Sequence, residues 1–194
     1  MIFKNKNNKS YNVGDGKIIW ESRSVSVNTV IIAKSKGKKY VLISKRGEGA
    51  ADYKGYWNVQ AGYIDWNETC TDAAKREVFE ETNINIDKIL KSCKIYDNHI
   101  DKFLYVNSAP DSNRQNITFN YGLYFKFNEL PLLDICNKNA ELNEVDEIKW
   151  VSMKEVGNYQ FAFYHNEDIH SYNEKYCTPW YNKMFKNIWK FISS

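Results

Sequence analysis

The sequence predicts a single α/β domain, and three observations lead to this expectation. The chain has 194 residues, 43% of them hydrophobic and 26% charged, so it can bury one sizeable core. Several segments are rich in β-branched and aromatic residues, as strands are. Between them lies one segment, residues 69–82, whose apolar residues repeat at helical spacing. We find no internal repeat and no linker that would divide the chain.

The first part of the chain is expected to hold an arm and four strands. Residues 1–16 are polar and rich in Asn and Lys, which predicts a flexible N-terminal arm before a domain over residues 17–194. A hairpin-type connection, KSKGKK, joins the second and third strands. The four expected strands are KIIWE at 17–21, SVSVNTVIIA at 24–33, YVLISKR at 40–46 and YWNVQAGYI at 56–64.

The segment 69–82 has the start signal of a helix. Thr69 can cap its first turn, and Asp72 stands three residues on, in the position of a capping box. After it the sequence alternates strand candidates with a loop, NSAPDSNRQ, at 107–115. The three further strand candidates are KILKSCKIYD at 88–97, NITFNYGLYFKF at 116–127 and VDEIKWVSM at 145–153.

An amphipathic helix is expected at residues 178–193. Thr178 and Pro179 suit its cap and its first position, and large apolar residues then repeat at helical spacing opposite lysines. Such a helix packs on its own domain or on a second subunit, which would make the protein a homodimer. A membrane-surface helix is the third alternative, and nothing else in the chain supports it.

Composition excludes several classes of function. The formal net charge is only +3 and the basic residues are scattered, so no nucleic-acid partner is expected. The four cysteines have no paired spacing, which argues against a zinc site or a disulfide framework. No run reaches membrane-spanning length and no signal peptide is recognisable. We therefore expect a cytoplasmic protein.

The expected helix 69–82 carries an unusual acidic face. Glu77, Glu80 and Glu81 lie within an arc of about 100° on a helix, where like charges destabilise it. Arg76 can hold one neighbouring carboxylate by a bidentate contact but cannot neutralise them all. A divalent cation that prefers oxygen ligands, Mg²⁺ or Mn²⁺, would remove the conflict. The alternative is a solvated acidic face.

The spacing around this face resembles the Nudix box, Gly-x5-Glu-x7-Arg-Glu-aliphatic-x-Glu-Glu-x-Gly-aliphatic. The matching positions are Gly62, Glu68, Arg76, Glu77, Val78, Glu80, Glu81 and Ile84. Asn83 stands where the family has glycine, and Asn is the residue after Gly that best tolerates a left-handed helix end. Ala61 replaces a glycine found in many members. Segments on both sides are also similar to the family, over residues 23–170 or so.

The resemblance implies an α/β/α sandwich around a mixed β-sheet and a hydrolase that cleaves a nucleoside diphosphate linked to another moiety. It implies Mg²⁺ as cofactor, with Mn²⁺ as a substitute. Glu80 and Glu81 are then the metal ligands with the carbonyl of Ala61, and Glu77 is either a ligand or the base that orients water. Glu68, Arg76 and Gly62 then surround these ligands and hold them in position. The rival interpretation is a nucleotide-binding sensor without turnover.

Further candidates lie outside the box. The family often recruits another acid from a later loop, and Glu144 is preferred here over Glu141 and Glu147. Arg46 and Arg114 are candidate phosphate contacts, and Tyr56 is a candidate aromatic platform for a base. The substrate is a small nucleotide, and a nucleoside triphosphate, a dinucleoside polyphosphate and a nucleotide sugar such as ADP-ribose all remain open.

Overall fold

The computed structural model describes residues 8–15, 17–109, 115–135 and 143–178. The strands are β1 Lys9–Asn12, β2 Ile18–Glu21, β3 Val25–Ser35, β4 Lys38–Arg46, β5 Trp57–Asn58, β6 Gln60–Tyr63, β7 Lys94–His99, β8 Tyr105–Asn107, β9 Ile117–Lys126 and β10 Val145–Ser152. The helices are α1 Cys70–Thr82, α2 Ile86–Ser92 and α3 His165–Tyr172, with the short turns η1 Val156–Asn158 and η2 Asn173–Cys177.

The main sheet is mixed. Its strands run in the order β10-β4-β3-β9-β7, while β6, β5 and β8 pair with β3, β4 and β9. β3 and β9 are parallel, with Asn28 beside Asn120, and the other pairs are antiparallel. The β3–β4 connection turns at Lys36 and Gly37, both with positive φ, as a tight hairpin requires. The chain therefore brings β3 to the centre, where β6 and β9 flank its first half.

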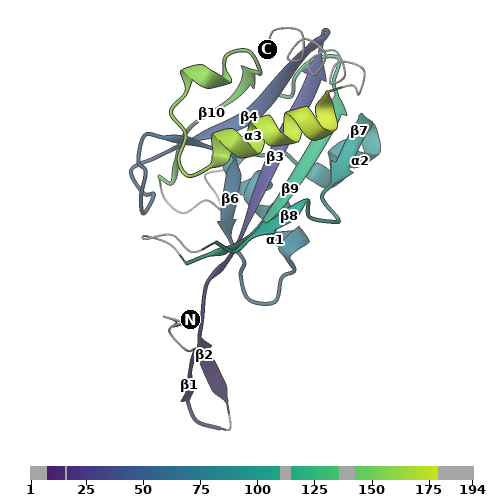
Figure 1. Ribbon diagram of the computed structural model, residues 1–194. Coiled ribbons are helices and arrows are strands. Elements are labelled where there is room, and N and C mark those ends of the chain that lie inside the picture. Colours follow the sequence, from purple (N-terminus) through teal and green to yellow (C-terminus); the bar gives the residue numbers. More distant parts are fainter. Residues whose placement is uncertain (1–7, 16, 110–114, 136–142, 179–194) are drawn as a thin grey trace, which may run out of the picture.

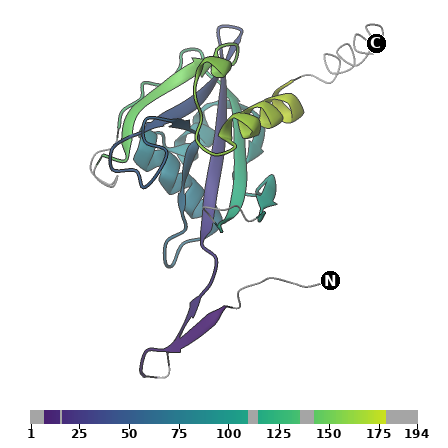
Figure 2. The same ribbon diagram turned by 60° about the vertical axis from the view of Figure 1, so that its left-hand side comes forward.

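Helices cover both faces of this sheet (Figures 1 and 2). On one face α1 and α2 pack through Ala74 and Ile86 against a core that includes Val27 and Ile31 of β3. On the other face Ile169 of α3 packs in a core with alternate residues of the sheet. Because side chains alternate along a strand, β3 feeds both cores at once. The expected sandwich around a mixed sheet is confirmed.

Most of the expected elements are confirmed, and one is wrong in part. We expected a strand over 88–97, but its first half belongs to helix α2, and β7 begins only at Lys94. The side chain of Asn85 caps this helix by accepting from Lys88 N at 2.9 Å. Ile86 and Ile89 are buried three residues apart, a helical spacing that the short segment concealed. The short strand β8 was not expected.

The N-terminal end of the described chain lies away from the sheet core, whereas its C-terminal end packs on that core through the buried Cys177. β1 and β2 form a separate two-stranded hairpin that projects from the domain (Figures 1 and 2), so β1 falls within the segment expected to be a flexible arm. The amphipathic helix expected over 178–193 falls outside the described residues, apart from Thr178. Among the described helices, none is long and apolar enough to cross a membrane.

Candidate functional site

Helix α1 is fixed at both ends by its own sequence. The hydroxyl of Thr69 accepts from Asp72 N at 3.1 Å, and the carboxylate of Asp72 accepts from Thr69 N, which completes the expected capping box. At the other end Asn83 has φ 58° and ψ 18°, the left-handed conformation for which the family uses glycine. The departure at Asn83 therefore leaves the helix end, and the position of its glutamates, intact.

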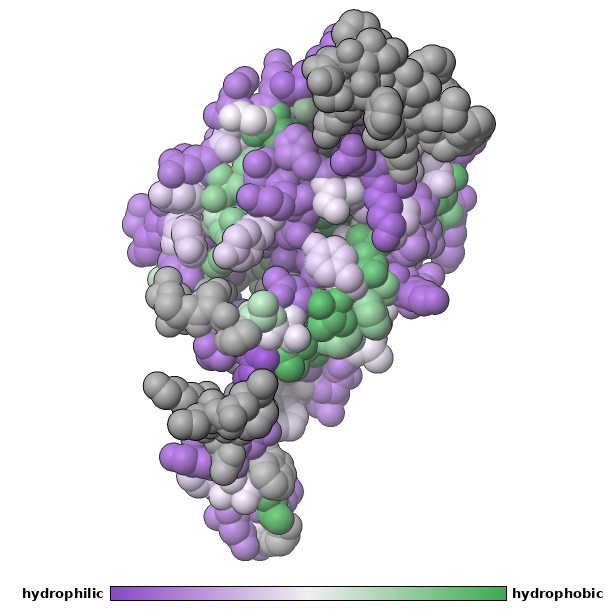
Figure 3. Space-filling model, in the orientation of Figure 1, coloured by the Kyte–Doolittle hydropathy of each residue, from purple (hydrophilic) through white to green (hydrophobic). Residues whose placement is uncertain are grey.

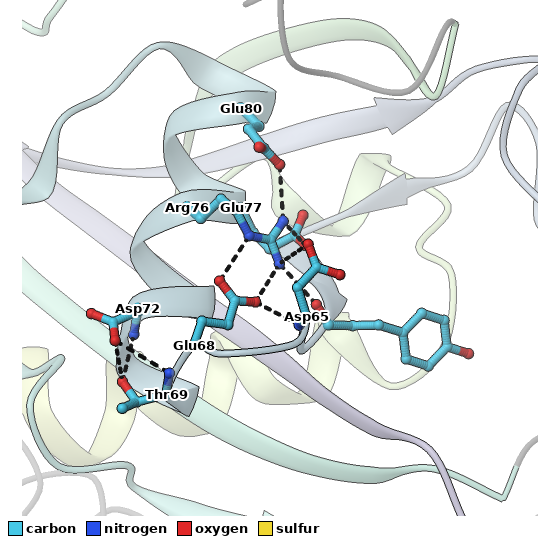
Figure 4. Close-up of polar contacts among 8 residues, drawn as sticks. Asp65, Glu68, Thr69, Asp72, Arg76, Glu77 and Glu80 are labelled. Carbon is cyan, nitrogen blue, oxygen red and sulfur yellow. Dashed lines mark hydrogen bonds and ion pairs between the residues drawn. The ribbon is translucent and has the colours of Figure 1, made fainter. Parts of the chain in front are cut away.

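Arg76 organises the acidic face of α1 (Figure 4). Its Nε and Nη2 donate to the two carboxylate oxygens of Glu68 at 3.0 and 2.7 Å, which is the expected bidentate contact. Its Nη1 donates to Glu77 Oε1 at 2.8 Å and to Glu80 Oε2 at 2.9 Å. Nη2 also donates to the carbonyl of Tyr63. One guanidinium thus ties the helix to the loop before it and holds two of the three clustered glutamates.

Glu81 points the other way, into the protein. Its residue is only 8% exposed, and its carboxylate accepts from Ser44 Oγ at 2.7 Å and from Ala61 N at 3.2 Å. Gln60 Nε2 donates in turn to Ser44 Oγ, which orients that hydroxyl toward Glu81. Burial, followed by the nearby charge of Glu77, raises the pKa of Glu81 to about 8. The position is one where a negative charge lacks the stabilisation that water would give.

Gly62 makes room for Glu77. A Cβ at this glycine would lie 2.0 Å from Glu77 Oε1, so any side chain would displace the carboxylate. Burial raises the pKa of Glu77 to about 7, opposed by Arg76 and aided by the charges of Glu80 and Glu144. Glu144, the preferred acid of the late loop, is therefore among the charges that act on Glu77. Glu141 lies outside the described residues, and Glu147 pairs with Lys149 at 2.6 Å.

The donor set suits a hard divalent cation. Carboxylate oxygens and a backbone carbonyl are the ligands that Mg²⁺ and Mn²⁺ prefer, and such a cation would compensate the charge that the buried Glu81 carries when it ionises. In the part of the chain that the structure describes, no three acidic, His or Cys side chains converge into a metal-binding cluster. The reason is visible in the contacts, because Arg76 holds Glu77 and Glu80 while Glu81 faces Ser44.

A cavity of about 210 Å³ opens beside this face, between the sheet and the start of α3. Ala61 and Gly62 of β6 form its border with the acidic cluster, and Asn28, Asn120 and Asp168 line its interior. Next to it, the guanidinium of Arg23 donates to the carbonyls of Ser108, Gln115 and Asn116, of which Asn116 lines the cavity. In Figure 3 the face of the molecule in view is mainly hydrophilic, with its largest group of apolar residues at the lower right of the globular part and smaller groups elsewhere.

The expected substrate contacts outside the box are Arg46, Tyr56 and Arg114, and they differ in where they lie. Arg46 lines the cavity, but its guanidinium also pairs with Asp52 at 3.0 Å and lies over the ring of Phe163. Tyr56 packs edge-on against Tyr53 and is not among the residues that line the cavity. Arg114 falls outside the described residues. Of the two that the structure describes, Arg46 lines the cavity and Tyr56 does not.

Several residues of the site were missed at the level of sequence. Ser44 lies on β4 and Asp168 on α3, and nothing in the local sequence marks either as a partner of the box. Asn28 did carry a signal, because it is a polar residue inside the apolar segment SVSVNTVIIA, where a strand buried on both faces is expected to be apolar. A polar residue at such a position is informative.

Known proteins of two kinds, a sequence relative and a solved structure, are similar to this chain. The oxidized purine nucleoside triphosphate hydrolase of Mus musculus is 26% identical over 117 residues, or 55% of this chain and 70% of the relative. The NUDIX domain of Shewanella oneidensis NrtR, solved with ADP ribose, has a TM-score of 0.60 at 18% identity, covering 80% of this chain and 89% of that one.

A second similar structure contains a metal. A bifunctional NMN adenylyltransferase/ADP ribose pyrophosphatase from Francisella tularensis, complexed with AMP and a Mn ion, has a TM-score of 0.54 at 22% identity. The match covers 81% of this chain and 42% of that one. The NUDIX domain family itself matches residues 22–173, most of the chain. This chain therefore belongs to the Nudix family of hydrolases.

Proposed function

We propose that the protein is a metal-dependent hydrolase that cleaves the pyrophosphate bond of a nucleoside diphosphate linked to another moiety. The observation that carries this proposal is the buried carboxyl of Glu81, which lies next to Glu77 and behind Ala61 and Gly62 at the border of the cavity. The ionised form of a carboxyl at such a position needs a positive partner, and a divalent cation would supply one.

The known proteins support the same chemistry. The mouse relative is named for hydrolysis of an oxidized purine nucleoside triphosphate. The two structural neighbours were solved with ADP ribose and with AMP and Mn. All three names involve a nucleotide with a diphosphate or its product. We accordingly propose Mg²⁺ as the cofactor, with Mn²⁺ as a substitute, and a nucleotide as the substrate.

Each residue of the box has a separate part in this proposal. Glu80 and Glu81 would hold the cation together with the carbonyl of Ala61, and Glu80 would exchange its contact with Arg76 for it. Glu77 is either a third ligand or the base, and Glu144 is the additional acid close to it. Arg76 and Glu68 position the helix face. The cation, when bound, supplies positive charge to the diphosphate oxygens.

The reaction is a hydrolysis at phosphorus. A water oxygen bonds to one phosphorus as the bridging P–O bond breaks, and the bridging oxygen leaves with the second phosphate group. The carboxylate of Glu77 suits the role of proton acceptor from this water, since burial raises its pKa to about 7, close to working pH. Gly62 leaves that carboxylate unobstructed.

A substrate panel tests the proposal. Nucleoside triphosphates, dinucleoside polyphosphates and nucleotide sugars would be incubated with the protein and Mg²⁺, with products separated by chromatography. At least one diphosphate-containing compound should turn over, and Glu81→Gln should lower the rate by about 100-fold or more, since the amide is a poorer metal ligand. Glu155→Gln, an exposed residue far from α1, is the matched control. Turnover of no compound, or a Glu81→Gln rate equal to that of the unaltered protein, would refute it.

A further inference from the structure

One face of the main sheet changes character along its length. Beneath α3, Val30 and Ile32 of β3 are buried in an apolar core. Toward the start of the same strand, the next residues on this face are Asn28 and Ser26. The parallel register places Thr118 and Asn120 of β9 directly beside them. A sheet face that turns from apolar to polar where α3 begins, and there borders a cavity, is built to contact something other than the core.

The polar side chains of this face are joined into one network. Asn28 Nδ2 donates to Asn120 Oδ1 at 3.3 Å, and Asn120 Nδ2 donates to the carbonyl of Thr118 at 3.2 Å. From α3, Asp168 accepts from the hydroxyl of Tyr105 and from the side chain of Asn28. Asn28 and Tyr105 thus direct side-chain hydrogens toward Asn120 and Asp168. The side-chain oxygens of Asn28 and Asp168 are therefore hydrogen-bond acceptors for a ligand in the cavity.

Asp168 is the member of the network whose negative charge is opposed by burial. It lies in the first turn of α3, and burial raises the pKa of its carboxyl, although Tyr105 and Asn28 partly compensate. A further N–H donor would stabilise the charged form. An anion such as a phosphate would be repelled, so the diphosphate end of a substrate belongs at the acidic helix with its cation, not here.

The position of the network relates it to that helix. Asn28 pairs in register with Ala61 of β6, whose N–H contacts Glu81. A ligand whose phosphates lie at the box therefore extends its next chemical group toward Asn28 and Asp168. Aromatic side chains, including Tyr105 and Phe163, also line this cavity and offer flat faces for stacking.

We propose, on the basis of the hydrolase function proposed above, that this cavity selects a nucleobase by its N–H edge. Asp168 and Asn28 accept hydrogen bonds from an exocyclic amino group or ring N–H of the base, while the aromatic residues contact its face. A ribose diol also donates hydrogen bonds, but the aromatic lining favours the base. Asp168 is thereby a specificity-determining residue, supplied by a helix far along the chain from the Nudix box.

Equilibrium binding of matched nucleotide pairs tests this inference without any need for turnover. Calorimetry would compare AMP with purine riboside 5′-monophosphate, which lacks the 6-amino group, and GMP with IMP, which lacks the 2-amino group. A 2′-deoxy form of the tighter ligand measures the contribution of the sugar. The variants are Asp168→Asn and Asn28→Thr, and Glu167→Gln is the control, an exposed acid in the same turn of α3.

The unaltered protein should prefer the amino-bearing member of at least one pair by about tenfold or more. Asp168→Asn, an isosteric change, and Asn28→Thr should each reduce that preference to about twofold, while Glu167→Gln keeps it. Equal affinity within both pairs overturns the inference, as does a larger loss from the 2′-deoxy change or an unchanged preference in both variants. Hydrolysis without any amino preference would overturn this inference alone, whereas an amino preference without hydrolysis would support it and count against the proposed function.

Discussion

The two sides of strand β6 solve the same problem, buried polarity, in opposite ways. On the α1 side, one guanidinium satisfies Glu68, Glu77 and Glu80, and Glu81 is left to a hydroxyl and a backbone N–H. On the α3 side, amides and hydroxyls satisfy one another around the single carboxyl of Asp168. The α1 side is dominated by net charge and the α3 side by hydrogen-bond direction.

This difference has consequences for binding. A cation at α1 must take carboxylate oxygens from Arg76, so its binding should depend strongly on pH and on salt. A base at α3 adds hydrogen bonds to a network that is already formed, so it should alter selectivity more than overall charge balance. We expect changes on the α1 side to affect stability and rate, and changes on the α3 side to affect discrimination.

The largest effect should be a pH dependence of stability that comes from the α1 side. Burial raises the pKa of Glu77 to about 7 and of Glu81 to about 8, so the folded protein holds protons that the unfolded chain releases near pH 4.5. The free energy of unfolding of the metal-free protein should therefore fall as pH rises from 5 to 8, by on the order of 6 kcal/mol. Urea denaturation in EDTA at several pH values measures it.

Glu81→Gln is the internal control for that experiment. The variant should lose a large part of the slope, because only Glu77 remains to titrate in this range. Acids with lowered pKa values, such as Glu68, contribute stability that is lost only at lower pH. A slope that is the same in both proteins would show that Glu81 is not the buried acid described here.

Next in size is the effect of filling the space at Gly62. Gly62→Ala places a Cβ against the carboxylate of Glu77, so we expect kcat/KM for the preferred diphosphate substrate to fall by about 100-fold, or about 2.7 kcal/mol of barrier. Gly157→Ala is the control, because a Cβ at Gly157 meets no atom within 4 Å. Comparable losses in the two variants would contradict the assigned role of Gly62.

A smaller effect is expected at Arg23, which contacts Asn116 in the wall of the cavity. Arg23→Ala removes the donors to three carbonyls of the β8–β9 loop, so KM for the nucleotide should rise about five- to tenfold with little change in kcat. Lys126→Ala, an exposed cation on β9, serves as the control for charge. A fall in kcat at constant KM would contradict this expectation, because it would mean that Arg23 affects the chemical step and not nucleotide binding.

The smallest effect concerns the end of α1. Asn83 adopts a left-handed conformation, so Asn83→Ala should lower the free energy of unfolding by about 1 kcal/mol, while Asn83→Gly should leave it equal or slightly higher. Thermal denaturation of the three proteins gives the order. If Ala is tolerated as well as Gly, the helix end does not require the left-handed residue.

The two sides also differ in how far the sequence could predict them. The α1 side lies within one segment, residues 62–83, so spacing along the chain determines spacing in the fold, and Arg76, Glu68 and the capping residues were all foreseen. Even there, the orientation of Glu81 toward Ser44 depends on a contact between residues 37 positions apart. Such a contact leaves no local pattern.

The α3 side could not be predicted for the same reason. Asn28, Tyr105 and Asp168 come from three separate elements that only the sheet topology brings together. Helix α2 was missed for a different reason, since its seven residues carry β-branched isoleucines that favour a strand, and a local cap at Asn85 decides otherwise. Local capping and long-range pairing are the two influences that strand patterns conceal.

The central claim is that the glutamates of α1 form a divalent cation site with the buried Glu81 at its base. Its most direct test is a Mn²⁺ titration followed by electron paramagnetic resonance, with AMP present, for the unaltered protein, Glu81→Gln and Glu167→Gln. We predict that Mn²⁺ binds the unaltered protein and Glu167→Gln equally, and Glu81→Gln at least about tenfold more weakly. Equal Mn²⁺ affinity in all three proteins, or no binding to any of them, would contradict it.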